Sequence, residues 1–155
     1  MIEKDNLISL VPHRGRMFLL GRVSKYDLEE CSVEAEYDIT EDCLFYDPVA
    51  GGVPVWASVE LVAQAISVLF GLMRRAIGLE PKLAFLLSVS LLKAETPVYK
   101  TGSTVVLKAI KVNCIEKMYT FDCSAFLEGR NVFSAKLTAV DADDEMINSY
   151  GKESV

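Results

Sequence analysis

The chain has 155 residues, of which 51% are hydrophobic and 25% charged, and its formal net charge is −6. This length suits one domain, and the composition provides a sizeable core, which argues against general disorder. Nucleic-acid binding normally requires a basic surface, so DNA and RNA are not expected partners of this acidic chain.

Neither the N-terminus nor the cysteines indicate export or a metal site. Charged and polar residues occupy positions 3–6, where the apolar part of a secretory signal would begin. None of the four cysteines shows the C-x-x-C spacing of zinc and redox sites. We therefore predict a cytoplasmic protein that keeps its thiols reduced and binds no metal.

Two strands are expected in the first part of the chain. Residues 17–26 form the first, and residues 31–39 alternate without error between an apolar face and a polar or charged face. Such alternation is typical of a strand with one buried and one solvated face. A loop follows over residues 40–53, with Asp47-Pro48 and Gly51-Gly52 as breakers.

A long apolar helix is predicted next. Pro54 suits a first helical turn and Gly78 a helix end, so the helix is expected from residue 54 to about 77. Residues 53–73 are apolar enough to suggest a membrane span, but they include Glu60, and a carboxylate in mid-span is costly in a bilayer. The buried core helix of a soluble domain is the better interpretation.

Four more strands complete the domain, over residues 84–95, 103–113, 119–127 and 132–140. Glu128-Gly129-Arg130 predicts a tight turn, so the last two strands should form a hairpin. The order ββαββββ indicates one α+β domain over residues 1–140, an antiparallel sheet wrapped around one long helix. The acidic segment 141–155 is expected to be a frayed tail.

Glu60 is the strongest candidate for chemistry. It is the only charged residue between Asp47 and Arg74, and it lies early in the apolar helix. Burying a carboxylate without a partner is costly, so Glu60 is expected to have a partner, a raised pKa or a water-filled cavity. A raised pKa is what a general acid or base near neutral pH requires. Gln64 follows at i+4 and is placed to hold the carboxylate. The alternative is that Glu60 faces solvent or stabilises the helix start through the dipole.

Two further features bear on catalysis. His13 is the only histidine, so any histidine chemistry of this chain depends on it. The alternative is a surface or structural histidine ahead of the first strand. Free backbone N–H groups at the helix start, near Val55, are able to bind a developing oxyanion, although every helix offers such groups.

Taken together, these residues resemble the hotdog-fold 3-hydroxyacyl-carrier-protein dehydratases. Within residues 10–23, LVPHR and FLLGRV look like that family's LPHR…FLLVDRV opening. Residues 59–65, VELVAQA, look like its IEAMAQA helix motif, and residues 85–102 resemble its GFLL…P…PGD stretch. The resemblance covers about residues 7–140 and implies the hotdog fold.

The loop before the helix departs from the family pattern. The family's catalytic histidine of the G-H-F-P-G loop is replaced by Tyr46. The glycine that follows the helix-opening proline is Val55 here, and Trp56 comes next. This pattern looks closest to the dehydratase-like proteins of aryl polyene gene clusters, a branch that lacks the loop histidine.

The resemblance implies syn elimination of water from a 3-hydroxyacyl thioester on an acyl carrier protein, in fatty-acid-like or polyene biosynthesis, without a metal or organic cofactor. Glu60 matches the helix acid, and the amide of Val55 matches the carbonyl-binding position. The missing loop histidine leaves the base open: His13 is the first candidate, and Tyr46 or Asp47 are weaker ones. The predicted catalytic residues are Glu60 and His13, and the predicted substrate-binding residues are Val55, Trp56, Gln64 and Tyr46.

Two other functions remain open at this point. One is a hotdog thioesterase, in which the helix carboxylate activates water. The other is a non-catalytic subunit that completes the active site of a true dehydratase. For all three functions we expect at least a dimer, a homodimer or a heterodimer with another hotdog subunit, because active sites of this fold lie between two subunits.

The carrier protein is expected to dock on basic residues, because carrier proteins are acidic. The local basic spots are Arg14, Arg16, Arg74 and Arg75. For Arg74 and Arg75 the alternative is that they only neutralise the C-terminus of the helix.

Overall fold

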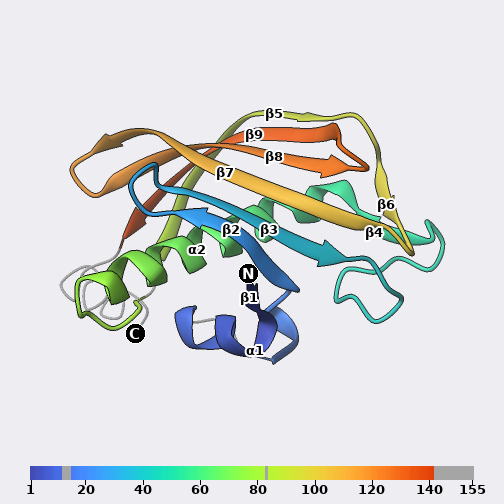
Figure 1. The fold of residues 1–155 in the computed structure, drawn as a ribbon. Helices are drawn as coiled ribbons and strands as arrows, with labels where there is room; N and C mark the ends of the chain where they lie inside the picture. The colour runs from blue at the N-terminus through green and yellow to red at the C-terminus, as the bar shows by residue number, and fades with distance from the viewer. Residues whose placement is uncertain (12–14, 83, 142–155) are drawn as a thin grey trace, which may run out of the picture.

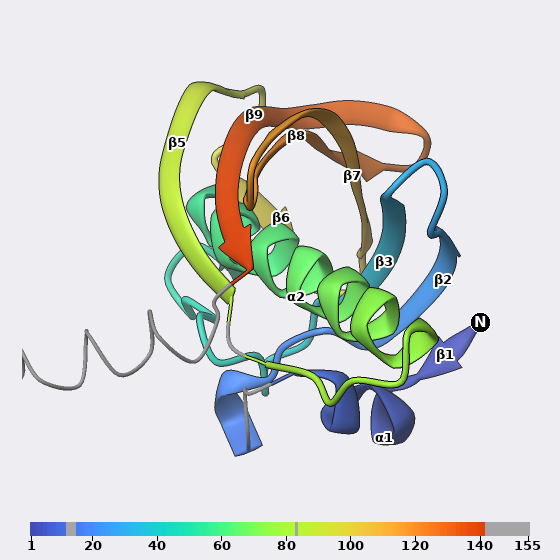
Figure 2. The same cartoon turned by 90° about the vertical axis from the view of Figure 1, so that its left-hand side faces the viewer.

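The centre of the fold is the helix α2, Ser58–Ala76, which lies against a curved antiparallel sheet. The computed structural model describes residues 1–11, 15–82 and 84–141. The sheet curves around one side of α2, and the N-terminal segment lies on the other side (Figures 1 and 2). This is the α+β hotdog arrangement that the sequence predicts.

The described residues form one main sheet and one small ribbon. The main sheet contains β1 (Ile2–Glu3), β2 (Arg22–Asp27), β3 (Ser32–Asp38), β5 (Ala84–Ala94), β7 (Thr104–Ile115), β8 (Met118–Leu127) and β9 (Arg130–Asp141), in the spatial order β1-β2-β3-β7-β8-β9-β5. The ribbon pairs β4 (Gly52–Pro54) with β6 (Val98–Lys100). The remaining short elements are α1 (Lys4–Leu7) and the 3₁₀ turns η1 (Ile8–Leu10), η2 (Gly15–Met17) and η3 (Val55–Ala57).

The alternating pattern predicts the face of β3 correctly. Val33, Ala35 and Tyr37 are buried, whereas Ser32, Glu34 and Glu36 are only half-buried on the opposite face. The predicted hairpin between β8 and β9 is also present. Its turn residues Glu128 and Gly129 both have positive φ, 50° and 78°, as the tightest hairpin turns require.

The first predicted strand begins later than expected, at Arg22 rather than at residue 17. Phe18, Leu19 and Leu20 are buried. The backbone N–H of Leu19 donates to the side chain of Gln64 on α2, at 2.9 Å, instead of to a neighbouring strand. This stretch therefore lies on the helix and does not join the sheet.

The α-helix starts at Ser58, four residues after the predicted start at Pro54, although the 3₁₀ turn η3 makes the chain helical from Val55. Pro54 ends β4, where it pairs with Val98, and η3 then leads into α2 at Ser58. The Val55 N–H donates to the Pro97 carbonyl oxygen at 3.0 Å, which holds the backbone against β6. Gly52 is required here, because a Cβ at that position would lie 2.0 Å from the Tyr99 carbonyl oxygen.

The N-terminal segment packs along α2 opposite the sheet. A Cβ at Gly71 would lie 2.3 Å from the carbonyl oxygen of Leu10, so only glycine permits this close approach. Near the helix end, the Arg75 guanidinium donates to the Ser9 carbonyl oxygen at 3.2 Å. These contacts explain why an apolar helix can belong to a soluble domain.

The helical residues 55–76 are long and apolar enough to cross a membrane, but most of this stretch is buried inside the fold. This agrees with the predicted core helix. The predicted tail from residue 142 onward lies outside the described residues.

One edge of the sheet remains open. Among the residues that the structure describes, β5 is the last strand in the sheet order, and β9 is its one pairing partner. Its apolar side chains are unusually exposed, at 43% for Leu86, 48% for Leu87 and 50% for Leu92. Figure 2 shows β5 alongside α2 at the edge of the curved sheet.

Candidate active site

Glu60 lies in the first turn of α2 and is half-buried. Its Oε1 accepts a hydrogen bond from Gln64 Nε2 at 2.9 Å. The sequence expectation that Gln64 holds the carboxylate is therefore met by the geometry. An acid in the first turn is also favoured by the positive end of the helix dipole.

Gln64 is fully buried and links α2 to the N-terminal segment. Besides Glu60, its Nε2 donates to the Met17 carbonyl oxygen at 2.7 Å, and its Oε1 accepts the Leu19 N–H at 2.9 Å. Both amide hydrogens are thus used within the chain. Gln64 therefore holds Glu60 in place, and neither amide hydrogen is left over for the substrate contact that we expected from the sequence.

A small pocket of about 140 Å³ opens beside Glu60. Its helix side consists of Glu60, Ala63, Ile66 and Ser67. Its opposite side is formed by Ala84, Phe85 and Leu86 of β5 and by Ala139 of β9. The carboxylate therefore faces a largely apolar space between α2 and the open edge of the sheet.

The first turn of α2 is fixed by a second buried contact. The Ser58 and Tyr99 hydroxyl oxygens lie 2.5 Å apart, and both residues are fully buried. Burial raises the pKa of Tyr99, and the hydrogen bond with Ser58 opposes that change only in part. The phenol therefore stays protonated at neutral pH and ties α2 to β6, which fixes the helix start that carries Glu60.

The amide expected to bind the thioester carbonyl is already engaged. Val55 N–H donates to the Pro97 carbonyl oxygen, and one hydrogen is all that a backbone amide offers. The next amide along η3 belongs to Trp56. Within the described residues it makes no backbone hydrogen bond outside η3, so its hydrogen is available to a ligand.

Trp56 is 58% exposed and packs edge-on against Phe45, with ring centroids 5.2 Å apart. An indole this exposed at the start of the helix forms part of the surface around the site. Tyr46 is half-buried in the preceding loop and is not among the residues that line the pocket beside Glu60.

Asp47 has a structural use in the same loop. Its Oδ1 accepts the N–H groups of Val49 at 2.9 Å and Ala50 at 3.3 Å. A carboxylate that holds its own turn in this way is a weak candidate for the base.

His13 lies outside the described residues, so its placement relative to Glu60 stays a prediction.

The arginines at the end of α2 make contacts within the chain. Arg74 donates to the Glu80 carbonyl oxygen at 2.6 Å and lies 3.7 Å from the Asp141 carboxylate, while Arg75 bonds to Ser9. These contacts give both residues a structural use, and the docking of a carrier protein on them stays a prediction. Arg14 is outside the described residues, as is the side chain of Arg16.

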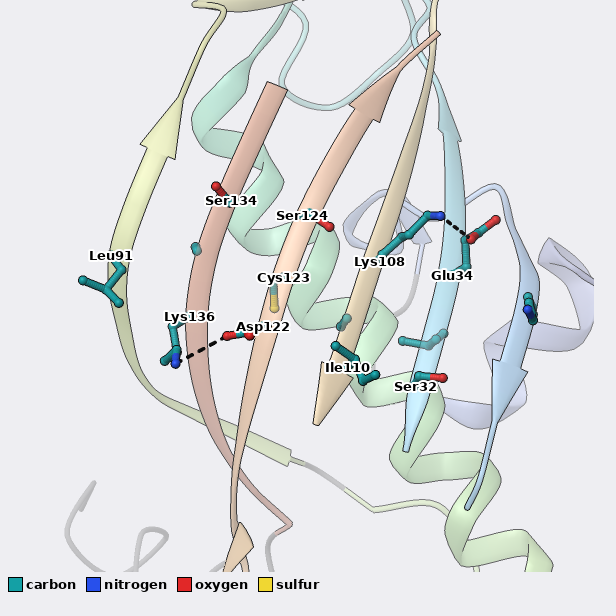
Figure 3. Close-up of a pocket in the computed structure, with 14 residues that line it drawn as sticks. Ser32, Glu34, Leu91, Lys108, Ile110, Asp122, Cys123, Ser124, Ser134 and Lys136 are labelled. Atoms are coloured by element: carbon teal, nitrogen blue, oxygen red, sulfur yellow. Dashed lines mark ion pairs between the residues drawn. The ribbon is translucent and has the colours of Figure 1, made fainter. Parts of the chain in front are cut away.

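A larger hollow of about 560 Å³ lies on the outer face of the sheet (Figure 3). Four of its charged side chains are paired across neighbouring strands, Lys108 with Glu34 at 3.1 Å and Lys136 with Asp122 at 3.5 Å. The sheet separates this hollow from α2, as Figure 3 shows. It is therefore not part of the site around Glu60.

The sequence did not single out Ala63, Ser67 or Ala139 as site residues, although all three line the pocket. For Ala63 and Ser67 a signal was present, because they follow Glu60 at i+3 and i+7 on one helix face. No local pattern indicates Ala139, because only the pairing of β5 with β9 brings it to the pocket.

Comparison with known proteins places this geometry in context. Residues 6–150 match the family model described as ApeP-like, ApeP dehydratase. A 3-hydroxyacyl-[acyl-carrier-protein] dehydratase FabZ from Chlamydia trachomatis serovar L2 is 33% identical over 108 residues, which is 68% of this chain and 69% of the relative.

Among solved structures, the dehydratase heterocomplex ApeI:P from Xenorhabdus doucetiae contains a chain that matches with a TM-score of 0.84 at 20% identity, covering 93% of this chain and 95% of that one. A hypothetical thioesterase with coenzyme A from Streptococcus pneumoniae matches with a TM-score of 0.59 at 16% identity, covering 77% and 83%. Both likenesses support the hotdog fold.

Proposed function

This chain belongs to the ApeP-like dehydratase family, and we propose that Glu60 is the acid–base group with which it serves the dehydration of 3-hydroxyacyl thioesters held on an acyl carrier protein. The pathway is fatty-acid or polyene biosynthesis. The observation that carries the proposal is the Glu60 carboxylate, fixed by Gln64 at the mouth of an apolar pocket.

The reaction requires two proton transfers. A base takes a proton from C2, the C2–C3 double bond forms, and the hydroxyl at C3 leaves as water after it receives a proton. Glu60 supplies one of these transfers. His13 is proposed for the other, because it is the only histidine of the chain and because Asp47 is occupied in its own turn.

The thioester carbonyl needs a hydrogen-bond donor as negative charge develops on its oxygen. We assign this role to the Trp56 amide in place of that of Val55, whose hydrogen is bonded to Pro97. The exposed Trp56 indole then borders the entrance for the carrier-bound arm. No step requires a metal or an organic cofactor.

A second hotdog subunit is proposed to cover β5. An exposed apolar edge strand is a ready template for pairing with another chain. Such a partner would also close the open side of the pocket, since Phe85 and Leu86 of β5 line it. It is a second copy of this chain or another hotdog protein, and the protein is proposed to work in the cytoplasm. Light scattering at micromolar concentration is expected to give a dimer, either for the purified chain alone or for the chain mixed with another hotdog subunit. Monomers in both samples would contradict this.

The function is tested by adding a 3-hydroxyacyl thioester to the purified chain and following the products. Enoyl thioester indicates dehydration, whereas free thiol indicates hydrolysis by a thioesterase. If neither forms with the chain alone but enoyl product forms after a second hotdog subunit is added, the chain acts as half of a shared site. If neither product forms in any combination, or if Glu60→Gln leaves turnover unchanged, the proposal is wrong.

A further inference from the structure

The pocket beside Glu60 contains one polar side chain other than the carboxylate. Glu60 and Ser67 are the two polar members of its lining, and the other residues are alanines, Ile66, Phe85 and Leu86. Ser67 follows Glu60 by seven residues, which is nearly two helical turns, so both lie on the same face of α2. Ala63 lies between them and leaves the space open.

Ser67 is half-buried and lines the pocket, and its hydroxyl makes no hydrogen bond to any residue that the structure describes. This differs from the other polar side chains nearby. Gln64 has three hydrogen bonds, and Ser58 is bonded to Tyr99. A helical serine often bonds back to the carbonyl four residues earlier, which Ser67 does not do.

An acyl chain that fills the pocket changes the surroundings of this hydroxyl. At about 140 Å³ the pocket is close in size to a cavity that holds one benzene molecule, roughly six carbons. A hydrocarbon of that size would displace water from Ser67 and leave its hydroxyl without a partner, which is unfavourable. An acyl group with an oxygen at that position would restore the hydrogen bond.

We propose that Ser67 is a specificity-determining residue, which selects acyl groups that carry a hydrogen-bonding oxygen at the far end of the pocket over plain hydrocarbon chains of the same length. The inference rests on the proposed function, because it takes Glu60 as the position of the reacting carbons. Sites built to bond a substrate oxygen discriminate against the analogue that lacks it, whereas apolar pockets discriminate weakly.

The test measures binding, so that it does not depend on turnover. Two pantetheine amides with six-carbon acyl groups are compared, one ending in a methyl group and the other in a hydroxyl. Their dissociation constants are measured by titration calorimetry with the full chain, together with its hotdog partner if one is required. The wild-type protein is expected to favour the hydroxyl-ended amide by about threefold to tenfold, the value of one neutral hydrogen bond.

Three variants sharpen the test. Ser67→Ala is expected to abolish or invert the preference, and Ser67→Thr to keep it, because threonine retains the hydroxyl. Ser124→Ala is the matched control, since Ser124 lies on the outer face of the sheet (Figure 3). This variant should prefer the hydroxyl-ended amide as strongly as the wild type does.

Equal affinities in the wild type, a preference that survives Ser67→Ala, or no binding of either amide would each overturn the proposal. If the preference depends on Ser67 but no dehydration occurs, the proposed function fails and the binding inference stands. If dehydration occurs without the preference, only the inference fails.

Discussion

The two sides of α2 differ in how completely their polar groups are used. On the side of the N-terminal segment, Gln64 is fully buried and every hydrogen of its amide is bonded within the chain. On the side of β5, Glu60 and Ser67 line an apolar pocket, and Ser67 has no partner among the described residues.

This difference indicates that one side of the helix mainly stabilises the fold and that the other side is available to a ligand. A buried polar group with all its partners holds the fold together, and removing it leaves those partners unsatisfied. A polar group that faces a pocket contributes little to folding and is available to a ligand. Substitutions on the two sides should therefore separate effects on stability from effects on the reaction.

The largest effect is expected for Glu60→Gln on the pocket side. The variant keeps the size of the side chain but cannot transfer a proton, so turnover should fall by about a hundredfold to ten-thousandfold. Unfolding by denaturant should change little. Glu80→Gln removes an exposed acid beyond the end of the helix and serves as the control. An equal loss of turnover in Glu60→Gln and Glu80→Gln would instead indicate a general effect of removing a negative charge.

His13→Asn should come next if His13 is the second proton-transfer group. We expect turnover to fall by about a hundredfold, with the midpoint of unfolding nearly unchanged. Full activity of this variant, while Glu60→Gln is inactive, would make His13 structural. Tyr46→Phe and Asp47→Asn would then be assayed, although Asp47 also holds its own turn.

Gln64→Leu tests the closed side of the helix. Leucine has a similar volume but leaves the buried Leu19 N–H and the partly buried Met17 carbonyl oxygen without their partner. At about 1–3 kcal/mol for each of the two unsatisfied groups, the free energy of unfolding should fall by roughly 2–6 kcal/mol. Urea denaturation measures this loss. A loss of unfolding free energy smaller than that of Ser67→Ala would show that the packing of the N-terminal segment on α2 does not depend on Gln64.

Gly71→Ala probes the same side through packing alone. The added Cβ would meet the Leu10 carbonyl oxygen at 2.3 Å, so the N-terminal segment must move away from α2. Overpacking of this kind costs about 1–3 kcal/mol, and thermal unfolding should register it. Gly78→Ala is unsuitable as a control, because Gly78 has a φ of 77°. Ala76→Gly at the exposed helix end is the better comparison.

The smallest effect on stability is expected for Ser67→Ala. No hydrogen bond to a described residue is lost, and alanine is a good helix former, so the free energy of unfolding should stay within about 0.5 kcal/mol of the wild type. Denaturant unfolding gives this value. A loss as large as that of Gln64→Leu would contradict the distinction between the two sides.

Much of the fold was predictable because its signals are local. The alternation in β3 and the turn at Glu128-Gly129 indicated the correct elements. The start of the helix was not predictable in the same way. Pro54 is equally suited to a first helical turn and to the end of a strand, and only its pairing with Val98 selects the strand.

The candidate site was predictable in part. A single carboxylate in an apolar helix indicates Glu60, and the i+4 spacing indicates Gln64. The role of Gln64 followed from contacts that no spacing shows, since Leu19 and Met17 lie 45 and 47 residues away in the chain. Assigning Gln64 to the substrate was therefore reasonable from the sequence and is not supported by its contacts.

By itself, the sequence determined which residues of α2 are able to do chemistry, because a charge or hydroxyl within an apolar repeat is visible locally. Only the tertiary structure decided which of those groups are already occupied. The Val55 amide is taken by Pro97 and Gln64 by the N-terminal segment, whereas Ser67 faces the pocket. The physical reason is that each polar group has few hydrogen-bonding positions, and the segments that fill them are brought together only by the fold.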